Sequence, residues 1–320
     1  MHKEGLQTNE TSHEESDVPF QSVAIVGMGL MGGALGLALK KFCPQVTVHA
    51  YARREETRKL ALEMGACDRV SDRIEDAVQD AELVILCTPI LDIPDLVEKI
   101  RDHLRPGAIV TDVGSTKEML MGEVAARLAG RDACFIGSHP MAGSERTGIE
   151  AAHENLYVQA VVIVTPPADN ALLSQTRMVQ ALWHSIGARV FVTHAADHDA
   201  IVAGTSHVPH LLAALLVRAA ARSAEKPGAY CGPGFRDCTR IASGSEGVWH
   251  DIVKSNPAPI AASLRGVRND IDLLLEALER KDFDAIRELL GKAREVRENI
   301  VGTKGARRLL RQKDSDRKNC

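Results

Sequence analysis

The sequence has few aromatic residues and no large excess of charge of either sign. Aromatic side chains make up 3% of its 320 residues, so the core must be built from Ala, Leu, Ile and Val. Such a core favours helices and helix-covered sheets over an aromatic-rich β-sandwich. The formal net charge is only -4, with 26% charged and 45% hydrophobic residues, and gives no bias toward nucleic acid or membrane partners. The length suggests about two domains.

Paired cysteines and a secretory leader are also lacking. The seven cysteines are dispersed and none belongs to a C-x-x-C pair, so in a chain this long they indicate reduced thiols and not a disulfide framework. The first twenty residues are polar and acidic, without the apolar segment of a signal peptide. The sequence therefore predicts a cytoplasmic protein.

No apolar run is long enough to suggest a membrane span. The longest, Val208–Val217, is interrupted by Pro209 and His210 and is too short to cross a bilayer. Residues 208–221 are nonetheless apolar almost all round, which predicts a helix buried between other elements. In a domain of this size such a helix also suggests a subunit interface, so we expect a homodimer.

Four segments follow from the pattern along the chain. Residues 1–20 are expected to form a disordered leader, and the Arg- and Lys-rich residues 304–320 a solvated basic tail. From 21 to 193, β-rich apolar runs alternate with helical stretches, which predicts a doubly wound, mostly parallel sheet covered on both faces. The predicted strands are 23–26, 46–51, 83–87, 108–111, 133–136, 161–164 and 189–192. From 194 to 303 only helical periodicity remains, which predicts an all-helical domain for substrate binding and dimerisation.

A glycine-rich turn follows the first predicted strand. Gly27, Gly29 and Gly32 form a G-x-G-x-x-G pattern between that strand and a helix, the arrangement of a Rossmann dinucleotide site. Gly27 permits the tight turn, Gly29 lets a pyrophosphate approach, and Gly32 allows close helix packing. Leu30 and Met31, between the glycines, are expected to contact the cofactor too. The alternative is a purely structural glycine turn.

The end of the second strand indicates which dinucleotide is bound. An NAD enzyme usually has Asp or Glu there, whereas this chain has Ala52 followed by Arg53 and Arg54. Two guanidinium groups suit a 2′-phosphate, so NADP is favoured, with NAD possible. The alternative is that both arginines are merely solvated. Thr88 and Pro89, after another strand, are expected to line the same cofactor.

Two further strand ends supply a candidate catalytic pair. Ser115 and His139 are expected on neighbouring strand-end loops near the nicotinamide. A neutral imidazole could accept the proton of a carbinol as hydride leaves the same carbon, and Ser115 could orient that ring. No metal is predicted, because neither of the closely spaced histidine pairs is completed by a Cys or a carboxylate. These pairs are His194 with His198 and His207 with His210.

Several motifs resemble those of the prephenate/arogenate (cyclohexadienyl) dehydrogenases. The segment 137–148 is similar to the HPMAG-containing signature of that family, and segments 197–199, 206–210 and 234–242 follow in the expected order. The resemblance runs from about Ser22 to about Val301. It implies oxidative decarboxylation of prephenate or arogenate with hydride transfer to NAD(P), in tyrosine biosynthesis.

The resemblance also implies roles for individual residues. His139 would take the proton of the ring hydroxyl, and Ser115 would bridge His139 and the nicotinamide. Arg240 would bind a substrate carboxylate, although Arg236 is an equal candidate from the bare sequence. The remaining residues implied around the substrate are Ser206, His210, Glu145 and Trp249. With no regulatory domain expected after Val301, any tyrosine inhibition would act at the active site.

Two other functions remain open from the residues alone. A different nicotinamide-dependent hydroxyacid dehydrogenase would rely on a Lys in the helical domain, but no Lys occurs between His194 and Glu225. A non-catalytic NADP-binding sensor would need neither His139 nor Arg240. The choice between prephenate and arogenate is not made by the sequence.

Overall fold

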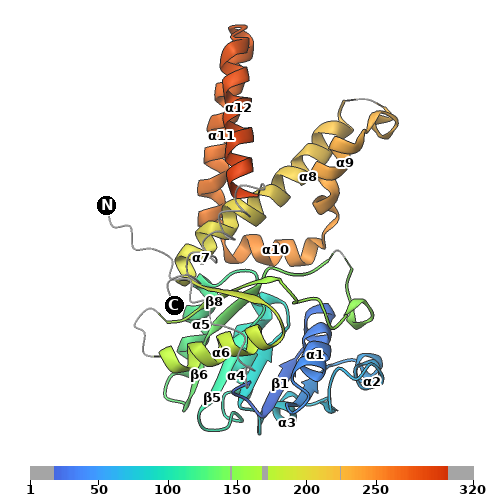
Figure 1. The fold of residues 1–320 in the computed structure, drawn as a ribbon, viewed down its shortest axis with the longest axis vertical. Helices are drawn as coiled ribbons and strands as arrows, with labels where there is room; N and C mark the ends of the chain where they lie inside the picture. Colours follow the sequence, from blue (N-terminus) through green and yellow to red (C-terminus); the bar gives the residue numbers. More distant parts are fainter. Residues whose placement is uncertain (1–17, 145, 168–171, 224, 302–320) are drawn as a thin grey trace, which may run out of the picture. The chain divides into compact units, whose positions relative to one another are not determined.

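The computed structural model describes residues 18–144, 146–167, 172–223 and 225–301 (Figure 1). Packing divides the chain into one compact unit that extends to Ile260 and a second that starts at Ala261. The predicted start of the helical domain at 194 therefore falls inside the first unit. Residue 145 and the predicted tail, 304–320, lie outside the described residues. The predicted leader extends too far, because Phe20 is buried in the core.

A six-stranded parallel sheet, in the order β3-β2-β1-β4-β5-β6, is the centre of the first unit. Its strands are β1 (Ser22–Val26), β2 (Thr47–Tyr51), β3 (Arg69–Ser71), β4 (Leu83–Leu86), β5 (Ala108–Asp112) and β6 (Ala133–Phe135). The strand order reverses at β1, which lies between β2 and β4. In such a sheet the ligand crevice opens beyond the carboxyl ends of the strands at this point. The predicted doubly wound fold is confirmed.

Helices cover both faces of this sheet. They are α1 (Leu30–Phe42), α2 (Glu55–Glu63), α3 (Ile74–Val78), α4 (Ile93–Ile100), α5 (Glu118–Leu128) and α6 (Leu173–Ser185), with short turns η1 (Ile90–Asp92) and η2 (Ile149–Ala151). Alternate residues of β1 point to opposite faces, so Val23 and Ile25 join a core with α1 and α6. Ala24 and Val26 join the core beneath α3, α4 and α5. Burial on both faces explains why the strands are apolar throughout.

A second, three-stranded sheet carries the histidine singled out in the sequence. It consists of β7 (Gly137–Pro140), β8 (Val161–Thr165) and β9 (Arg189–Val192), with β7 antiparallel to β8. His139 lies in β7 opposite Ile163, so the prediction of a loop at this position was wrong. The strand β3 was missed as well. Both are short and lack a β-branched run, so pairing with a neighbour decides their conformation.

The helical part begins with one continuous helix, Ala195–Ala221, of 27 residues. It contains α7 (Ala195–Val202), the π-helical turn η3 (Ala203–His207) and α8 (Val208–Ala221). Pro209, which interrupts the apolar run in the sequence, does not break this helix, because it lies in the first turn of α8 directly after the wider π turn. By length and composition this helix is the one in the described chain that could cross a membrane, with 33% of its most apolar window buried.

Every described element after α8 is also helical. These are η4 (Pro227–Tyr230), α9 (Pro233–Thr239), η5 (Arg240–Ser243), α10 (Glu246–Ser255), α11 (Pro257–Glu279) and α12 (Phe283–Ile300). The helix predicted over 208–221 to be buried between other elements is not buried toward the end of α8, where Leu215, Leu216 and Val217 are exposed in the single chain. In the second unit, α11 and α12 also leave large apolar side chains exposed, among them Leu273, Phe283 and Leu290.

Candidate active site

The glycine-rich turn leaves the amino end of α1 open for a ligand. Gly27 has a φ of 99°, and a Cβ there would lie 2.7 Å from the Cys87 carbonyl oxygen. A Cβ on Gly32 would lie 1.9 Å from the Gly27 carbonyl oxygen, so both positions require glycine. A Cβ on Gly29 would meet nothing within 4 Å, and no side chain caps α1 there.

The surroundings of this turn fit a dinucleotide. The first N–H groups of α1, at Leu30 and Met31, belong to a helix end without a side-chain cap, as a bound phosphate requires. After β4, the hydroxyl of Thr88 is buried without a hydrogen-bond partner among the described residues, next to Gly27. Pro89 follows and precedes η1. An open helix end beside an unpartnered hydroxyl is suited to a pyrophosphate.

Arginines gather where β2 ends. Ala52 is buried, whereas Arg53 and Arg54 are exposed and make no ion pair with any described residue. Arg58 donates from Nη1 to the carbonyl oxygens of Ala52, at 3.0 Å, and Arg53, at 2.8 Å. Arg58 thus holds the backbone of the turn, while the two guanidinium groups before it face solvent. The position where NAD enzymes carry an acidic residue has no carboxylate here.

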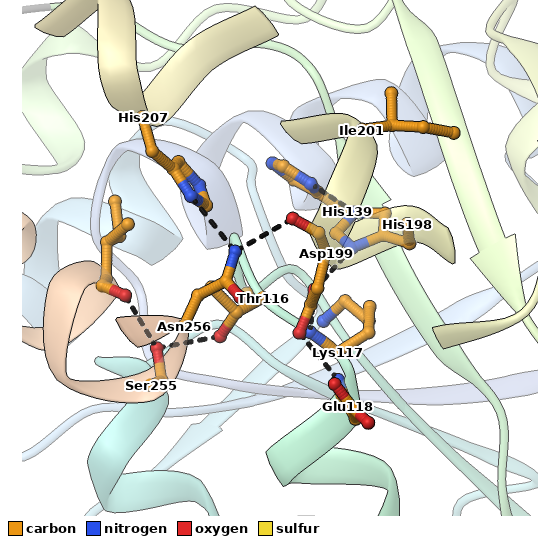
Figure 2. Close-up of polar contacts among 12 residues, drawn as sticks. Thr116, Lys117, Glu118, His139, His198, Asp199, Ile201, His207, Ser255 and Asn256 are labelled. Atoms are coloured by element: carbon orange, nitrogen blue, oxygen red, sulfur yellow. Dashed lines mark hydrogen bonds and ion pairs between the residues drawn. The ribbon is translucent and has the colours of Figure 1, made fainter. Parts of the chain in front are cut away.

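A buried chain of polar groups starts at His139 (Figure 2). Nδ1 of His139 lies 2.8 Å from Nε2 of His198, and Nδ1 of His198 lies 2.7 Å from Oδ1 of Asp199. All three side chains are buried. The two histidines are 59 residues apart, and β7 and α7 bring them together. Both ring nitrogens of His198 are therefore occupied, which leaves none for the metal pair with His194 considered from the sequence.

Asp199 is fixed by three further hydrogen bonds. Its two carboxylate oxygens accept from the backbone N–H groups of Lys117, at 2.8 Å, and Glu118, at 2.9 Å, at the amino end of α5. The side-chain amide of Asn256 donates to the Asp199 carbonyl oxygen at 2.9 Å. The amino end of α5 and the end of α10 therefore both bond to this one residue of α7, and the positive end of the α5 dipole also favours its carboxylate.

A buried ion pair lies beside this chain. The Lys117 ammonium contacts Oδ2 of Asp112, and both side chains are fully buried. The same carboxylate accepts from the N–H of Gly114 at 2.7 Å and from that of Ser138 at 3.0 Å. Asp112 thus ties the end of β5 to β7 directly before His139. Burial lowers the pKa of Lys117, and the negative charge of Asp112 opposes that effect.

His139 is held in its neutral form. Burial is the largest cause, and the neighbouring ionisable groups His198, Lys117 and His207 add to it, so the pKa of His139 lies well below its usual 6.5. At neutral pH the ring is therefore an uncharged imidazole, which can accept a proton.

A second group of aromatic side chains continues from Asn256. The Asn256 amide lies 3.3 Å from Nδ1 of His207, whose ring meets Trp249 edge-on with centroids 6.2 Å apart. Trp249 stacks on His210 at 3.4 Å. Burial lowers the pKa of His207 to about 4, and its Nε2 is buried without a partner among the described residues.

Gly244 connects this aromatic group to the turn that carries Arg240. A Cβ on Gly244 would lie 2.7 Å from Nε1 of Trp249 and 3.1 Å from Cε1 of His210. Gly244 directly follows η5, which begins at Arg240. A continuous series of contacts and backbone therefore runs from His139 to the Arg240 turn, within the first unit.

The other predicted site residues are less closely connected. Ser115 is half-buried and makes no hydrogen bond to His139 in the described part of the chain, where His139 bonds to His198 instead. Ser206 is half-buried in the π turn, and Arg236 and Arg240 are exposed. Glu145 lies outside the described residues.

Five polar residues of this region had no predicted role. They are Lys117, His198, Asp199, His207 and Asn256. The only signal in the sequence was that His198, Asp199 and His207 belong to segments resembling the family. Their contacts join residues as much as 82 positions apart, which a sequence pattern does not show.

The fold and the open glycine turn define a doubly wound, dinucleotide-binding oxidoreductase. Residues 35–192 match the family profile described as the nucleotide-binding domain of prephenate dehydrogenase, and residues 194–292 match its dimerization domain. The chain belongs to the prephenate dehydrogenase family. It is a nicotinamide-dependent dehydrogenase.

Two curated relatives support this assignment. The cyclohexadienyl dehydrogenase of Zymomonas mobilis is 31% identical over 87% of this chain and 95% of its own length. The prephenate dehydrogenase of Lactococcus lactis is 29% identical, over 89% and 79%.

Two solved structures are similar at 29% identity. Prephenate dehydrogenase from A. aeolicus, in complex with hydroxyphenyl propionate and NAD+, has a TM-score of 0.81 and covers 88% of this chain and 98% of its own. Synechocystis arogenate dehydrogenase has a TM-score of 0.77 and covers 88% and 100%.

Proposed function

We propose that this protein oxidatively decarboxylates prephenate, arogenate or both, and that it uses NADP in preference to NAD. The relatives' names, which include prephenate, arogenate and cyclohexadienyl dehydrogenases, support the reaction. The observation that carries it is the buried, uncharged His139 at the edge of the nucleotide-binding fold. The arginines at the end of β2 support NADP, although the A. aeolicus structure contains NAD+.

In the proposed mechanism the protein supplies one base and the alignment of the substrate. The nicotinamide, when bound, accepts the hydride that leaves the hydroxyl-bearing ring carbon. His139 accepts the hydroxyl proton, and the ring carboxylate leaves as CO₂ while the ring becomes aromatic. Because the imidazole is neutral and desolvated, it takes that proton without first losing one.

The remaining predicted residues are proposed to bind and align the substrate. A guanidinium suits a substrate carboxylate, which is the role proposed for Arg240. His210 stacked on Trp249 forms a flat aromatic wall suited to a six-membered ring. Ser115, Ser206 and Glu145 remain proposed site residues. Residues 21–193 would bind the dinucleotide, and residues 194–303 would complete the substrate site and dimerise.

An absorbance assay of nicotinamide reduction tests this proposal, with prephenate and arogenate each combined with NAD and NADP. We expect turnover of at least one substrate and a higher kcat/KM with NADP. Absence of turnover in all four combinations contradicts the reaction. Equal or better use of NAD contradicts the cofactor preference only.

We also propose a cytoplasmic homodimer inhibited by tyrosine at the active site. The exposed apolar side chains of α8, and separately those of α11 and α12, support burial of these helices against a second copy. Light scattering should give twice the mass of the chain. Tyrosine should raise KM for the substrate without lowering kcat. If excess substrate does not relieve the inhibition, tyrosine does not act at the active site.

A further inference from the structure

We propose that His198 and Asp199 are positioning residues that fix the tautomer of His139, leaving its Nε2 unprotonated and able to accept the substrate's proton. The inference deepens the proposed function, because it concerns the same base. It depends on the order of donors and acceptors in the buried chain from Asp199 to His139 (Figure 2).

The order begins at Asp199, whose carboxylate oxygens can only accept. Two of the groups that contact them are backbone N–H groups, of Lys117 and Glu118, and these can only donate. The third contact, Nδ1 of His198, must therefore carry a hydrogen and donate to Oδ1 of Asp199.

The remaining protons follow from the charge of the two rings. With Nδ1 of His198 protonated and the ring neutral, its Nε2 has a lone pair and accepts from Nδ1–H of His139. His139 is neutral, so its single ring proton lies on Nδ1 and its Nε2 carries a lone pair. Without the carboxylate, nothing would prefer this tautomer over its opposite.

The same chain can receive the proton taken from the substrate. The hydroxyl O–H bond breaks and a bond to Nε2 of His139 forms, while the Nδ1 proton of His139 can pass to Nε2 of His198. The resulting imidazolium of His198 is then paired with the Asp199 carboxylate, so the positive charge is neutralised within a buried region. The substrate oxygen keeps the electron pair of the broken O–H bond.

A second His–Asp pair in the chain provides a matched control. Nδ1 of His250 lies 2.9 Å from Oδ1 of Asp251, but the His250 side chain is exposed and touches no second histidine among the described residues. Asp199→Asn removes the acceptor-only partner of the buried pair, and Asp251→Asn makes the same chemical change at the exposed pair.

We expect Asp199→Asn to lower kcat by about 10²–10⁴-fold, because an amide can stabilise the wrong tautomer of the adjacent histidine. KM and cofactor affinity, measured by fluorescence titration, should change by only a few-fold. Asp251→Asn should retain wild-type kcat. An Asp199→Asn protein with wild-type kcat overturns the inference, as does one in which kcat, KM and cofactor affinity all deteriorate together.

Nitrogen-15 NMR of the wild-type protein tests the tautomer of His139 directly. It needs no enzyme assay and does not depend on whether the Asp199→Asn variant folds. In protein labelled at its 12 histidines, the His139 signals are identified by their loss in His139→Asn. Nδ1 should appear protonated and Nε2 unprotonated at neutral pH. A His139 ring protonated at Nε2 instead of Nδ1 overturns the inference, even if the enzyme is active. If the ring is protonated at Nδ1 but the protein turns over neither prephenate nor arogenate, only the proposed function is overturned.

Discussion

The chain contains the dipeptide His-Asp twice in opposite surroundings, at 198–199 and at 250–251. The same two atoms meet in both, at 2.7 Å and 2.9 Å. The side chains of the first pair are 0% and 1% exposed, and those of the second are 69% and 22% exposed. An exposed ion pair is screened by water and contributes little. The dipeptide alone therefore does not fix where the ring protons lie. Burial and additional hydrogen-bond partners are needed as well.

The largest effect on activity is expected from a substitution of His139. This residue contacts the buried His-Asp pair, whereas the exposed pair has no such partner among the described residues. His139→Asn should lower kcat by about 10²–10⁴-fold, because the general base is lost. Cofactor affinity should be retained, since His139 is not part of the glycine turn. Steady-state kinetics and cofactor titration measure both quantities.

The matched control is His250→Asn at the exposed pair, which should keep wild-type kinetics. A His139→Asn enzyme that still turns over at the wild-type rate would show that another group acts as the base.

The next effect concerns stability and compares a buried ion pair with an exposed one. Lys117→Met leaves the Asp112 carboxylate buried without its cation, which typically costs about 3–5 kcal/mol. Lys59→Met breaks the exposed pair with Glu55 and should change stability far less. Urea unfolding followed by circular dichroism measures both, and equal losses would contradict the role assigned to burial.

The smallest effect is expected at the exposed arginines after β2, where no buried partner fixes the geometry. Arg53→Ser together with Arg54→Ser should lower kcat/KM for NADP by about 10–100-fold, as two charge-assisted hydrogen bonds are lost. The kcat/KM for NAD should change only a few-fold. If both cofactors lose equally, the arginines do not select the 2′-phosphate.

The sequence predicted the parts of the fold that depend on local pattern. Seven apolar runs became strands, and the glycine turn lies where the G-x-G-x-x-G spacing indicated. The strand at His139 was missed because its conformation depends on pairing with β8, which begins over twenty residues later. The π turn that precedes Pro209 was not predicted.

The candidate site was predictable only in part, for the same reason. His139 follows from a motif, but its partner His198 lies 59 residues away and the ends of α5 and α10 complete the chain. Spacing along the sequence contains no information on such contacts. The identity of the neutral base could be predicted, whereas the groups that order its protons could not.

The pH dependence of kcat/KM is the most direct test of the central claim that His139 acts as a neutral base. Its pKa is lowered, so the active form persists below pH 6.5 and is lost only as the pH falls through that lower value. The titratable groups around it are His198, Asp199, Lys117 and His207. We predict that the acidic limb of kcat/KM has its midpoint clearly below 6.5. A midpoint at or above 6.5, or a rate that rises on acidification, would contradict the account.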